Sequence, residues 1–150
     1  MAFANYGFSV IGVDVDEEKV ANLNNGVSYV EDVDSAEIAS LVNVGKFQAS
    51  VSYDELALAD AISICVPTPL NKTGDPDVGY IINAADNIAR VGAAGKLVVL
   101  ESTTYPGTTE EVILPRVAGE SATVGDDLFV AFSPERIDPC LLYTSDAADE

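Results

Sequence analysis

Four short polar stretches follow apolar runs along the chain, and each holds side chains that can donate, accept or move protons. The first is Asp14, after run 8–13, and the second is Val66, Pro67 and Thr68, at the end of run 61–66. The third is Ser102 and Thr103, after run 96–100, and the fourth is Glu135 and Arg136, after run 129–132. Such runs are typical of buried parallel strands. Because parallel strands end at one edge of a sheet, where ligands bind, these residues predict a shared cleft.

Asp14 has the most specific chemistry of these residues. A carboxylate at a strand end can accept both hydroxyl protons of an adenosine ribose and repels the 2′-phosphate of NADP, so it favours NAD. In dinucleotide-binding folds this acid follows the glycine-rich turn of the first strand–helix unit by about 20 residues. Counting back from Asp14 passes residue 1, so we expect the chain to begin inside the first helix of such a unit.

Lys19 and Thr68 each leave two interpretations open. Lys19 lies on the helix predicted to begin at Asp16, and it is either a neighbour of a bound ribose or a solvated lysine. Pro67 and Pro69 on either side of Thr68 predict a rigid extended turn. That turn can press its backbone against a flat ligand, although the residues alone favour a purely structural turn.

The composition excludes several kinds of function. The 150 residues fit one domain, and a hydrophobic content of 48% predicts a packed core. The net charge of −18 argues against binding to nucleic acid or anionic membranes, and is typical of a solvated cytoplasmic surface. No apolar stretch reaches the roughly 18 residues of a membrane span.

The chain has no histidine, which removes Ser-His-Asp triads and most zinc sites. Its two cysteines, Cys65 and Cys140, have neither metal-ligand spacing nor a disulfide framework. We expect no bound metal, and we expect Cys65 to be a buried small hydrophobe within AISICV.

Predicted strands alternate with predicted helices. Capping boxes at 34–37 and 52–55 begin two helices, a helical pattern covers 78–91, and a further helix begins near Thr108. Five strands separated by helices predict an α/β fold with a parallel sheet.

Four motifs, FSVIGVDVDEEKV, ICVPTPL, ESTTYPGTTEE and FSPERIDP, occur in this order over roughly residues 2–139. Together they resemble the N-terminal domain of the UDP-glucose/GDP-mannose dehydrogenase family, most nearly its UDP-N-acetylglucosamine 6-dehydrogenases. The resemblance implies a Rossmann-type doubly wound parallel sheet. It also implies a homodimeric enzyme that uses two NAD to oxidise the 6-hydroxyl of a UDP-sugar, of the UDP-N-acetylglucosamine or UDP-glucose type, to a carboxylate.

The resemblance also implies roles for individual residues. The residues implied to bind NAD are Asp14, Lys19, Val66, Pro67, Thr68, Ser102 and Thr103. Thr103 and Glu135 would be catalytic, and Glu135 and Arg136 would contact the substrate. Removing a hydride from an alcohol requires a proton acceptor, and without histidine a carboxylate acting through a water is a plausible route. Thr103 could orient that water as donor and acceptor.

The chain also departs from the family pattern. The glycine-rich turn and first strand are absent, and in the usual strand order 3-2-1-4-5-6 that strand is central. We therefore expect two unpaired edges inside the sheet. The family's nucleophilic cysteine lies far downstream, and neither Cys65 nor Cys140 matches its motif.

Residues 140–150 have no place in the family pattern. We interpret 1–139 as a partial NAD-binding domain and 140–150 as a tail of vector or adaptor origin, with a divergent C-terminal turn as the alternative. We expect such a fragment to be inactive alone. Two other functions stay open, namely another Rossmann enzyme, such as a hydroxyacid dehydrogenase or a methyltransferase, or a non-catalytic nucleotide-binding module.

Overall fold

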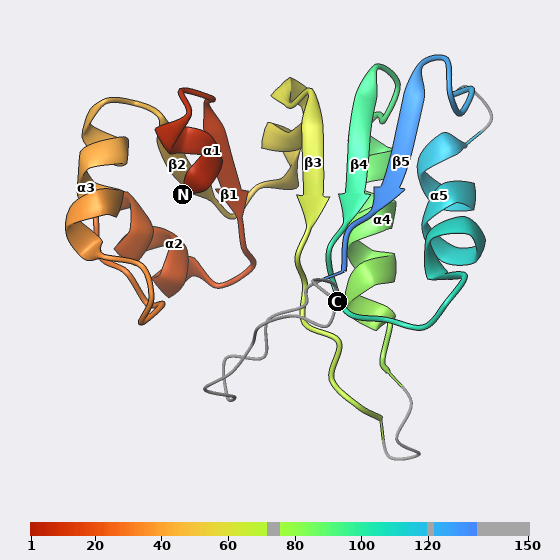
Figure 1. The fold of residues 1–150 in the computed structure, drawn as a ribbon, viewed down its shortest axis with the longest axis horizontal. Coiled ribbons are helices and arrows are strands. Elements are labelled where there is room, and N and C mark those ends of the chain that lie inside the picture. Colours follow the sequence, from red (N-terminus) through yellow and green to blue (C-terminus); the bar gives the residue numbers. More distant parts are fainter. Residues whose placement is uncertain (72–75, 120–121, 135–150) are drawn as a thin grey trace, which may run out of the picture. The chain divides into compact units, whose positions relative to one another are not determined.

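The computed structural model describes residues 1–71, 76–119 and 122–134, which form two compact units (Figure 1). The first unit is Met1–Leu58 and the second begins at Ala59. Among the described residues, all pairings between the named strands are parallel. Parallel strands alternating with helices confirm the predicted α/β class.

The first unit holds a two-stranded sheet and its helices. In chain order its elements are α1 (Ala2–Asn5), β1 (Val10–Val13), α2 (Glu17–Asn24), α3 (Ser35–Asn43), β2 (Phe47–Ser50) and the 3-10 helix η1 (Tyr53–Leu58). The register places Val10 beside Phe47 and Val13 beside Ser50. Ala4, Val20, Ile38, Leu41, Phe47 and Ala49 form its buried core.

Strand β1 is shorter and more exposed than the apolar run 8–13 predicts. It begins at Val10, its four residues are half-buried, and Phe8 is exposed outside it. The ring of Phe8 packs edge-on against Phe3, with 6.2 Å between ring centroids. Within the described residues β1 pairs with β2 alone, so it lacks the second neighbour that a fully buried parallel strand has.

Aspartates begin the two longer helices of this unit. The Asp16 side chain caps α2, which confirms the predicted start of this helix. Asp34 Oδ1 accepts from the Ala36 N–H at 2.9 Å and caps α3. The capping box at 34–37 is only partly formed, because Glu37 Oε1 accepts from Asn5 Nδ2 at 2.6 Å and so ties α3 to the N-terminal helix.

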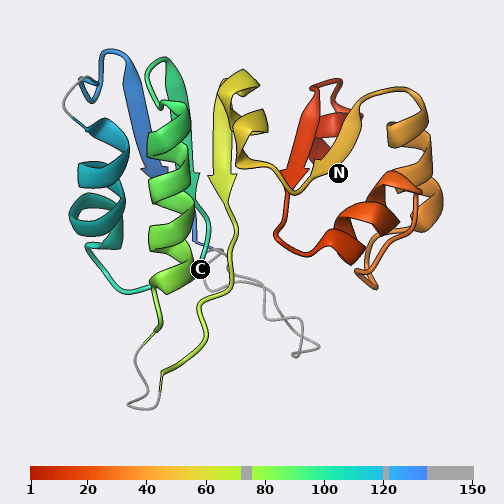
Figure 2. The same ribbon diagram turned by 180° about the vertical axis from the view of Figure 1, so that it is seen from behind.

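The second unit is a three-stranded sheet with helices on one face (Figures 1 and 2). Its elements are β3 (Ala61–Ile64), α4 (Gly79–Val91), β4 (Lys96–Leu100), the π-helix η2 (Thr109–Ile113), α5 (Leu114–Ala118) and β5 (Leu128–Phe132). The strand order is β3-β4-β5, and the register aligns Ala61, Leu97 and Phe129 in one row. The buried residues of this sheet and its helices include Ile62, Ile64, Ile81, Val98, Leu100, Ile113 and Leu128.

The opposite face of this sheet shows why the prediction for Cys65 is wrong. Leu97 and Phe129 are exposed there, and burial along β3 alternates from residue to residue. Cys65 follows the end of β3 and is exposed rather than buried. Its Sγ lies 3.1 Å from Ser63 Oγ and 3.6 Å from a carboxylate oxygen of Glu101.

The described strands pair in two separate parallel sheets. In the described part of the chain, β1 pairs with β2 alone and β3 pairs with β4 alone. Among the described strands, β1 and β3 therefore each have one unpaired edge. None of the described helices is long and apolar enough to cross a membrane.

Candidate functional site: a strand-end carboxylate and two strand-end turns

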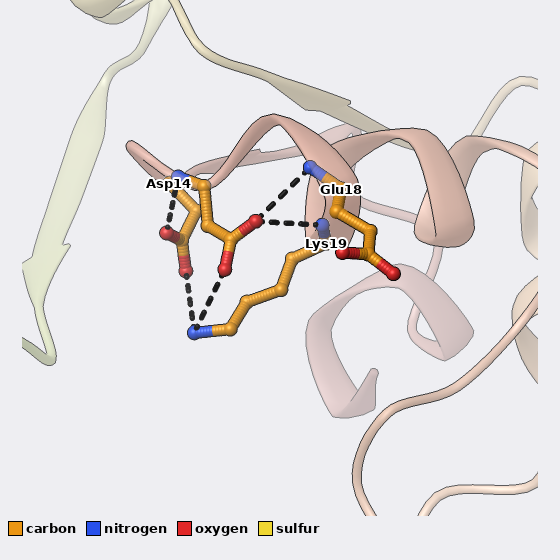
Figure 3. Close-up of polar contacts among 4 residues, drawn as sticks. Asp14, Glu18 and Lys19 are labelled. Carbon is orange, nitrogen blue, oxygen red and sulfur yellow. Dashed lines mark hydrogen bonds and ion pairs between the residues drawn. The ribbon is translucent and has the colours of Figure 1, made fainter.

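The carboxylate of Asp14 lies directly after β1 and is held in place from one side (Figure 3). Its Oδ1 accepts from the backbone N–H of Asp16 at 3.0 Å. Its Oδ2 lies 3.9 Å from the Nζ atom of Lys19, and one third of the side chain is exposed. One carboxylate oxygen therefore anchors the side chain, while the other keeps lone pairs available for a ligand.

The first turn of α2 positions Lys19. Asp16 Oδ1 accepts from the N–H groups of Glu18, at 3.0 Å, and Lys19, at 3.2 Å (Figure 3). The side chain of Lys19 extends back along this turn, and its Nζ lies 4.0 Å from Asp16 Oδ2. The same Nζ lies 5.3 Å from the ring centroid of Tyr29. The ammonium thus has carboxylates and an aromatic face around it.

These residues fit the adenosine-ribose end of NAD. The Oδ2 atom of Asp14 has lone pairs that can accept protons from a vicinal diol, and the ammonium of Lys19 can donate to a ribose oxygen. Glu17 and Glu18 add negative charge in the first turn of α2, which disfavours a 2′-phosphate. The sequence contains no GxGxxG turn for the pyrophosphate. The structural fit therefore covers the ribose end of the cofactor only.

In the second unit, the turn after β3 is held by Ser102. Ser102 Oγ donates to the carbonyl oxygen of Val66 at 2.7 Å and lies 3.2 Å from that of Ile64. The Asp77 N–H donates to the carbonyl oxygen of Pro69 at 2.8 Å at the far end of the turn. Pro67 is exposed and Thr68 is half-buried. The segment after β3 forms neither helix nor strand, and it begins at Cys65, two residues before the predicted turn at Pro67.

The turn after β4 contains two hydroxyl groups that are hydrogen-bonded to each other. The Oγ1 atoms of Thr104 and Thr108 lie 2.9 Å apart, and Thr108 Oγ1 also donates to the Tyr105 carbonyl oxygen at 2.9 Å. Gly107 has a φ of +95°, the conformation that a Pro-Gly type II turn requires. Thr103 precedes this pair and its side chain is exposed.

The structure brings together some of the predicted residues. Asp14 and Lys19 are neighbours in the first unit, and the turn at Val66 contacts Ser102 in the second. Glu135 and Arg136 lie outside the described residues, as do Cys140 and the tail at 140–150. Sequence reasoning missed Tyr29, which approaches Lys19 only because of the turn between α2 and α3.

Comparisons with known proteins extend over most of the chain. Residues 1–145 match the model of the UDP-glucose/GDP-mannose dehydrogenase family, NAD binding domain. The chain is 34% identical over 144 residues to UDP-N-acetyl-D-mannosamine dehydrogenase of Pyrococcus horikoshii, covering 94% of this chain and 34% of the relative. It is 32% identical over 132 residues to UDP-N-acetyl-D-glucosamine 6-dehydrogenase of Pseudomonas aeruginosa, covering 87% of this chain and 31% of that relative.

The fold agrees with these sequence matches. A crystal structure of GDP-mannose dehydrogenase from Pseudomonas aeruginosa superimposes with a TM-score of 0.83 at 31% identity, covering 89% of this chain and 32% of that one. The chain spans about a third of the length of the curated relatives it matches. The parallel sheets, the strand-end turns and the family match show that this chain belongs to the UDP-glucose/GDP-mannose dehydrogenase family and corresponds to its NAD-binding domain.

Proposed function

We propose that the full-length protein carrying this domain uses NAD to oxidise the 6-hydroxyl of a UDP-sugar, of the UDP-N-acetylglucosamine or UDP-glucose type, to a carboxylate. The observation that carries the proposal is the Asp14 carboxylate, fixed at a strand end with one oxygen available, in a chain of this family. A homodimer in the cytoplasm is the expected setting of the full-length enzyme. Residues 1–139 would be its partial NAD-binding domain, followed by a non-family tail at 140–150.

The proposed cofactor contacts rest on the family resemblance of individual residues. Asp14 and Lys19 would hold the adenosine ribose, and the turn at 66–68 would lie against the cofactor with the Thr68 hydroxyl as a polar contact. Ser102 would act mainly through that turn, because its hydroxyl proton is engaged by a backbone carbonyl.

The proposed catalytic residues are Thr103, which follows β4, and Glu135, which lies outside the described residues. NAD supplies the hydride acceptor when it is bound. The exposed hydroxyl of Thr103 can orient a water near the reacting alcohol, and Glu135 would take up the proton through that water. Arg136 would contact the substrate. The roles of Glu135 and Arg136 rest on the SPER motif and its family resemblance.

The test combines the encoding DNA with an assay. The codons beyond both ends of this chain are expected to supply a strand with a GxGxxG turn on one side and a domain with a reactive cysteine on the other. The full-length protein is then assayed for NADH formation with NAD and a panel containing UDP-N-acetylglucosamine, UDP-glucose, UDP-N-acetylmannosamine, GDP-mannose and a set of 2- and 3-hydroxyacids. Relatives named for several of these sugars motivate the panel.

The outcomes separate the three functions considered. NADH formation with a UDP-sugar supports the proposal, and the sugar that reacts defines the substrate. A non-catalytic nucleotide-binding module would be favoured if the reading frame encodes no reactive cysteine and the full-length protein binds NAD without forming NADH. Turnover of a hydroxyacid and of none of the nucleotide sugars would favour another Rossmann dehydrogenase.

A further inference from the structure

The ring of Tyr29 is half-exposed and contacts a charged group of the ribose site. Its centroid lies 5.3 Å from the Nζ atom of Lys19, within the roughly 6 Å range of cation–π attraction. Within the described part of the chain, this ammonium has three neighbours, which are the ring and the carboxylates of Asp14 and Asp16. Tyr29 is the one of the three that carries no charge.

The loop between α2 and α3 is built to hold this ring in place. Gly26 has a φ of +74°, and a Cβ added there would lie 2.6 Å from the Cβ of Ala39, so only glycine lets the chain turn this close to α3. The Val27 N–H then donates to the Asn22 carbonyl oxygen at 2.9 Å. The backbone on the N-terminal side of Tyr29 is therefore fixed to both helices.

Ser28 bonds to residues on the C-terminal side of Tyr29. Its N–H donates to Ser35 Oγ at 2.9 Å, and its hydroxyl donates to the Val30 carbonyl oxygen at 2.8 Å. The Val30 N–H donates back to the same hydroxyl at 3.1 Å. Tyr29 lies between these two residues, so its backbone position is determined by hydrogen bonds on both sides.

The carboxylates alone hold the ammonium weakly. Lys19 Nζ lies 3.9 Å from Asp14 and 4.0 Å from Asp16, which is beyond hydrogen-bonding distance, and the side chains are partly exposed. Exposed ion pairs of this kind contribute little, and a lysine side chain has four flexible carbons to restrain. The aromatic face adds a restraint that leaves the N–H donors available to a ligand.

We propose that Tyr29 is a positioning residue for NAD, because its ring face keeps the Lys19 ammonium beside the Asp14 carboxylate where both groups can contact the adenosine ribose. This inference rests on the proposed role of Asp14 in ribose binding. A cation–π contact at an exposed site corresponds to about 0.5–1 kcal/mol, so loss of the ring weakens NAD binding about two- to fivefold.

The test is a double-mutant cycle in the full-length protein, with NAD affinity measured by calorimetry. Tyr29→Leu is expected to weaken binding two- to fivefold in the wild-type background and to have no further effect when Lys19 is Met. Tyr29→Phe keeps the aromatic face and is expected to bind NAD like the wild type. The KM for NAD is expected to follow the dissociation constant while kcat stays unchanged.

Tyr6→Leu is the matched control, because Tyr6 is an exposed tyrosine in the same unit with no contact to the ribose site. Equal weakening by Tyr29→Leu with and without Lys19 would overturn the inference, as would weakening in Tyr29→Phe. If Asp14→Ala also leaves NAD affinity unchanged, the proposed ribose site itself is wrong. If Asp14→Ala weakens binding and Tyr29→Leu does not, only the role of Tyr29 is lost.

A second measurement needs no substitution. In the folded wild-type protein, the ring current of Tyr29 is expected to shift the Hε resonances of Lys19 upfield of those of the other lysines. Resonances at the random-coil position would show that the ring does not hold the ammonium in solution, and would overturn the inference.

Discussion

The hydroxyl of Ser102 donates a hydrogen bond of 2.7 Å to the carbonyl oxygen of Val66, and so joins the end of β4 to the turn that follows β3. Ser102 is buried, and its backbone N–H also donates to the Ile64 carbonyl oxygen at 3.2 Å. Two strand ends that the family motifs place near the cofactor are thus tied through one side chain. The shape of the turn depends on a residue 36 positions away.

Ser102→Ala is expected to destabilise the chain by about 1–3 kcal/mol, because the Val66 carbonyl then loses its partner in a buried setting. Urea unfolding of the purified chain measures the difference. Ser133→Ala is the control, since this serine follows β5 with an exposed side chain. A Ser102 variant as stable as the Ser133 variant would show that the bond to Val66 contributes nothing.

The sequence predicted those features that depend on neighbours along the chain. Residues 96–100 form β4 with the predicted bounds, and Asp16 begins α2, because a β-branched apolar run and an acidic cap act locally. The strand-end position of Asp14 and the Pro-Thr-Pro turn follow from the same reasoning. The family motifs added the prediction that the cofactor is NAD.

Features that depend on tertiary contacts could not be predicted. Cys65 looked buried within an apolar run, but the strand ends one residue earlier and its side chain is exposed. The meeting of Tyr29 with Lys19 depends on how the chain turns at Gly26 against α3. Neither residue type nor spacing specifies such a contact.

Asn24→Ala is expected to expose the backbone of β2. The side chain of Asn24 accepts from the Ala49 N–H at 2.8 Å and donates to the Ala49 carbonyl oxygen at 2.9 Å. Loss of both bonds is expected to speed hydrogen exchange of the Ala49 amide about thirtyfold, because each bond contributes on the order of 1 kcal/mol. Exchange followed by NMR measures this rate.

Asn25→Ala serves as the control for this exchange experiment, because Asn25 is the adjacent exposed asparagine at the end of the same helix. It is expected to leave the Ala49 amide as protected as in the wild type. Unchanged exchange in the Asn24 variant would mean that β2 does not need the side chain of Asn24 at its edge.

Thr108→Val is expected to lower the free energy of unfolding by about 1–3 kcal/mol. Thr108 is almost fully buried, and the isosteric valine lacks the hydroxyl that donates to the Tyr105 carbonyl and pairs with the Thr104 hydroxyl. Thr108→Ser keeps the hydroxyl and should retain most of the stability. A Thr108→Val variant as stable as the wild type would show that the hydrogen bonds of this hydroxyl contribute nothing to stability.

Asp14→Asn in the full-length protein is expected to weaken NAD binding about tenfold or more, since hydrogen bonds to a charged acceptor contribute about 1.5–3 kcal/mol. The asparagine oxygen can still accept from the Asp16 N–H, so the local fold should persist. The preference for NAD over NADP should narrow, because a negative charge facing the 2′-phosphate is removed. Calorimetry with both cofactors tests this, and Asp32→Asn controls for the change in net charge.

The 150-residue chain alone is expected to bind NAD more weakly than about 1 mM and to form no NADH with any UDP-sugar. Asp14 and Lys19 can hold the ribose, but the sequence contains no glycine-rich turn whose backbone could bind the pyrophosphate. Adenosine, AMP and ADP should therefore bind with affinities within about threefold of one another, because added phosphates gain no partners. A steep rise in affinity from adenosine to ADP, measured by NMR titration, would mean that other residues of this chain hold the phosphates.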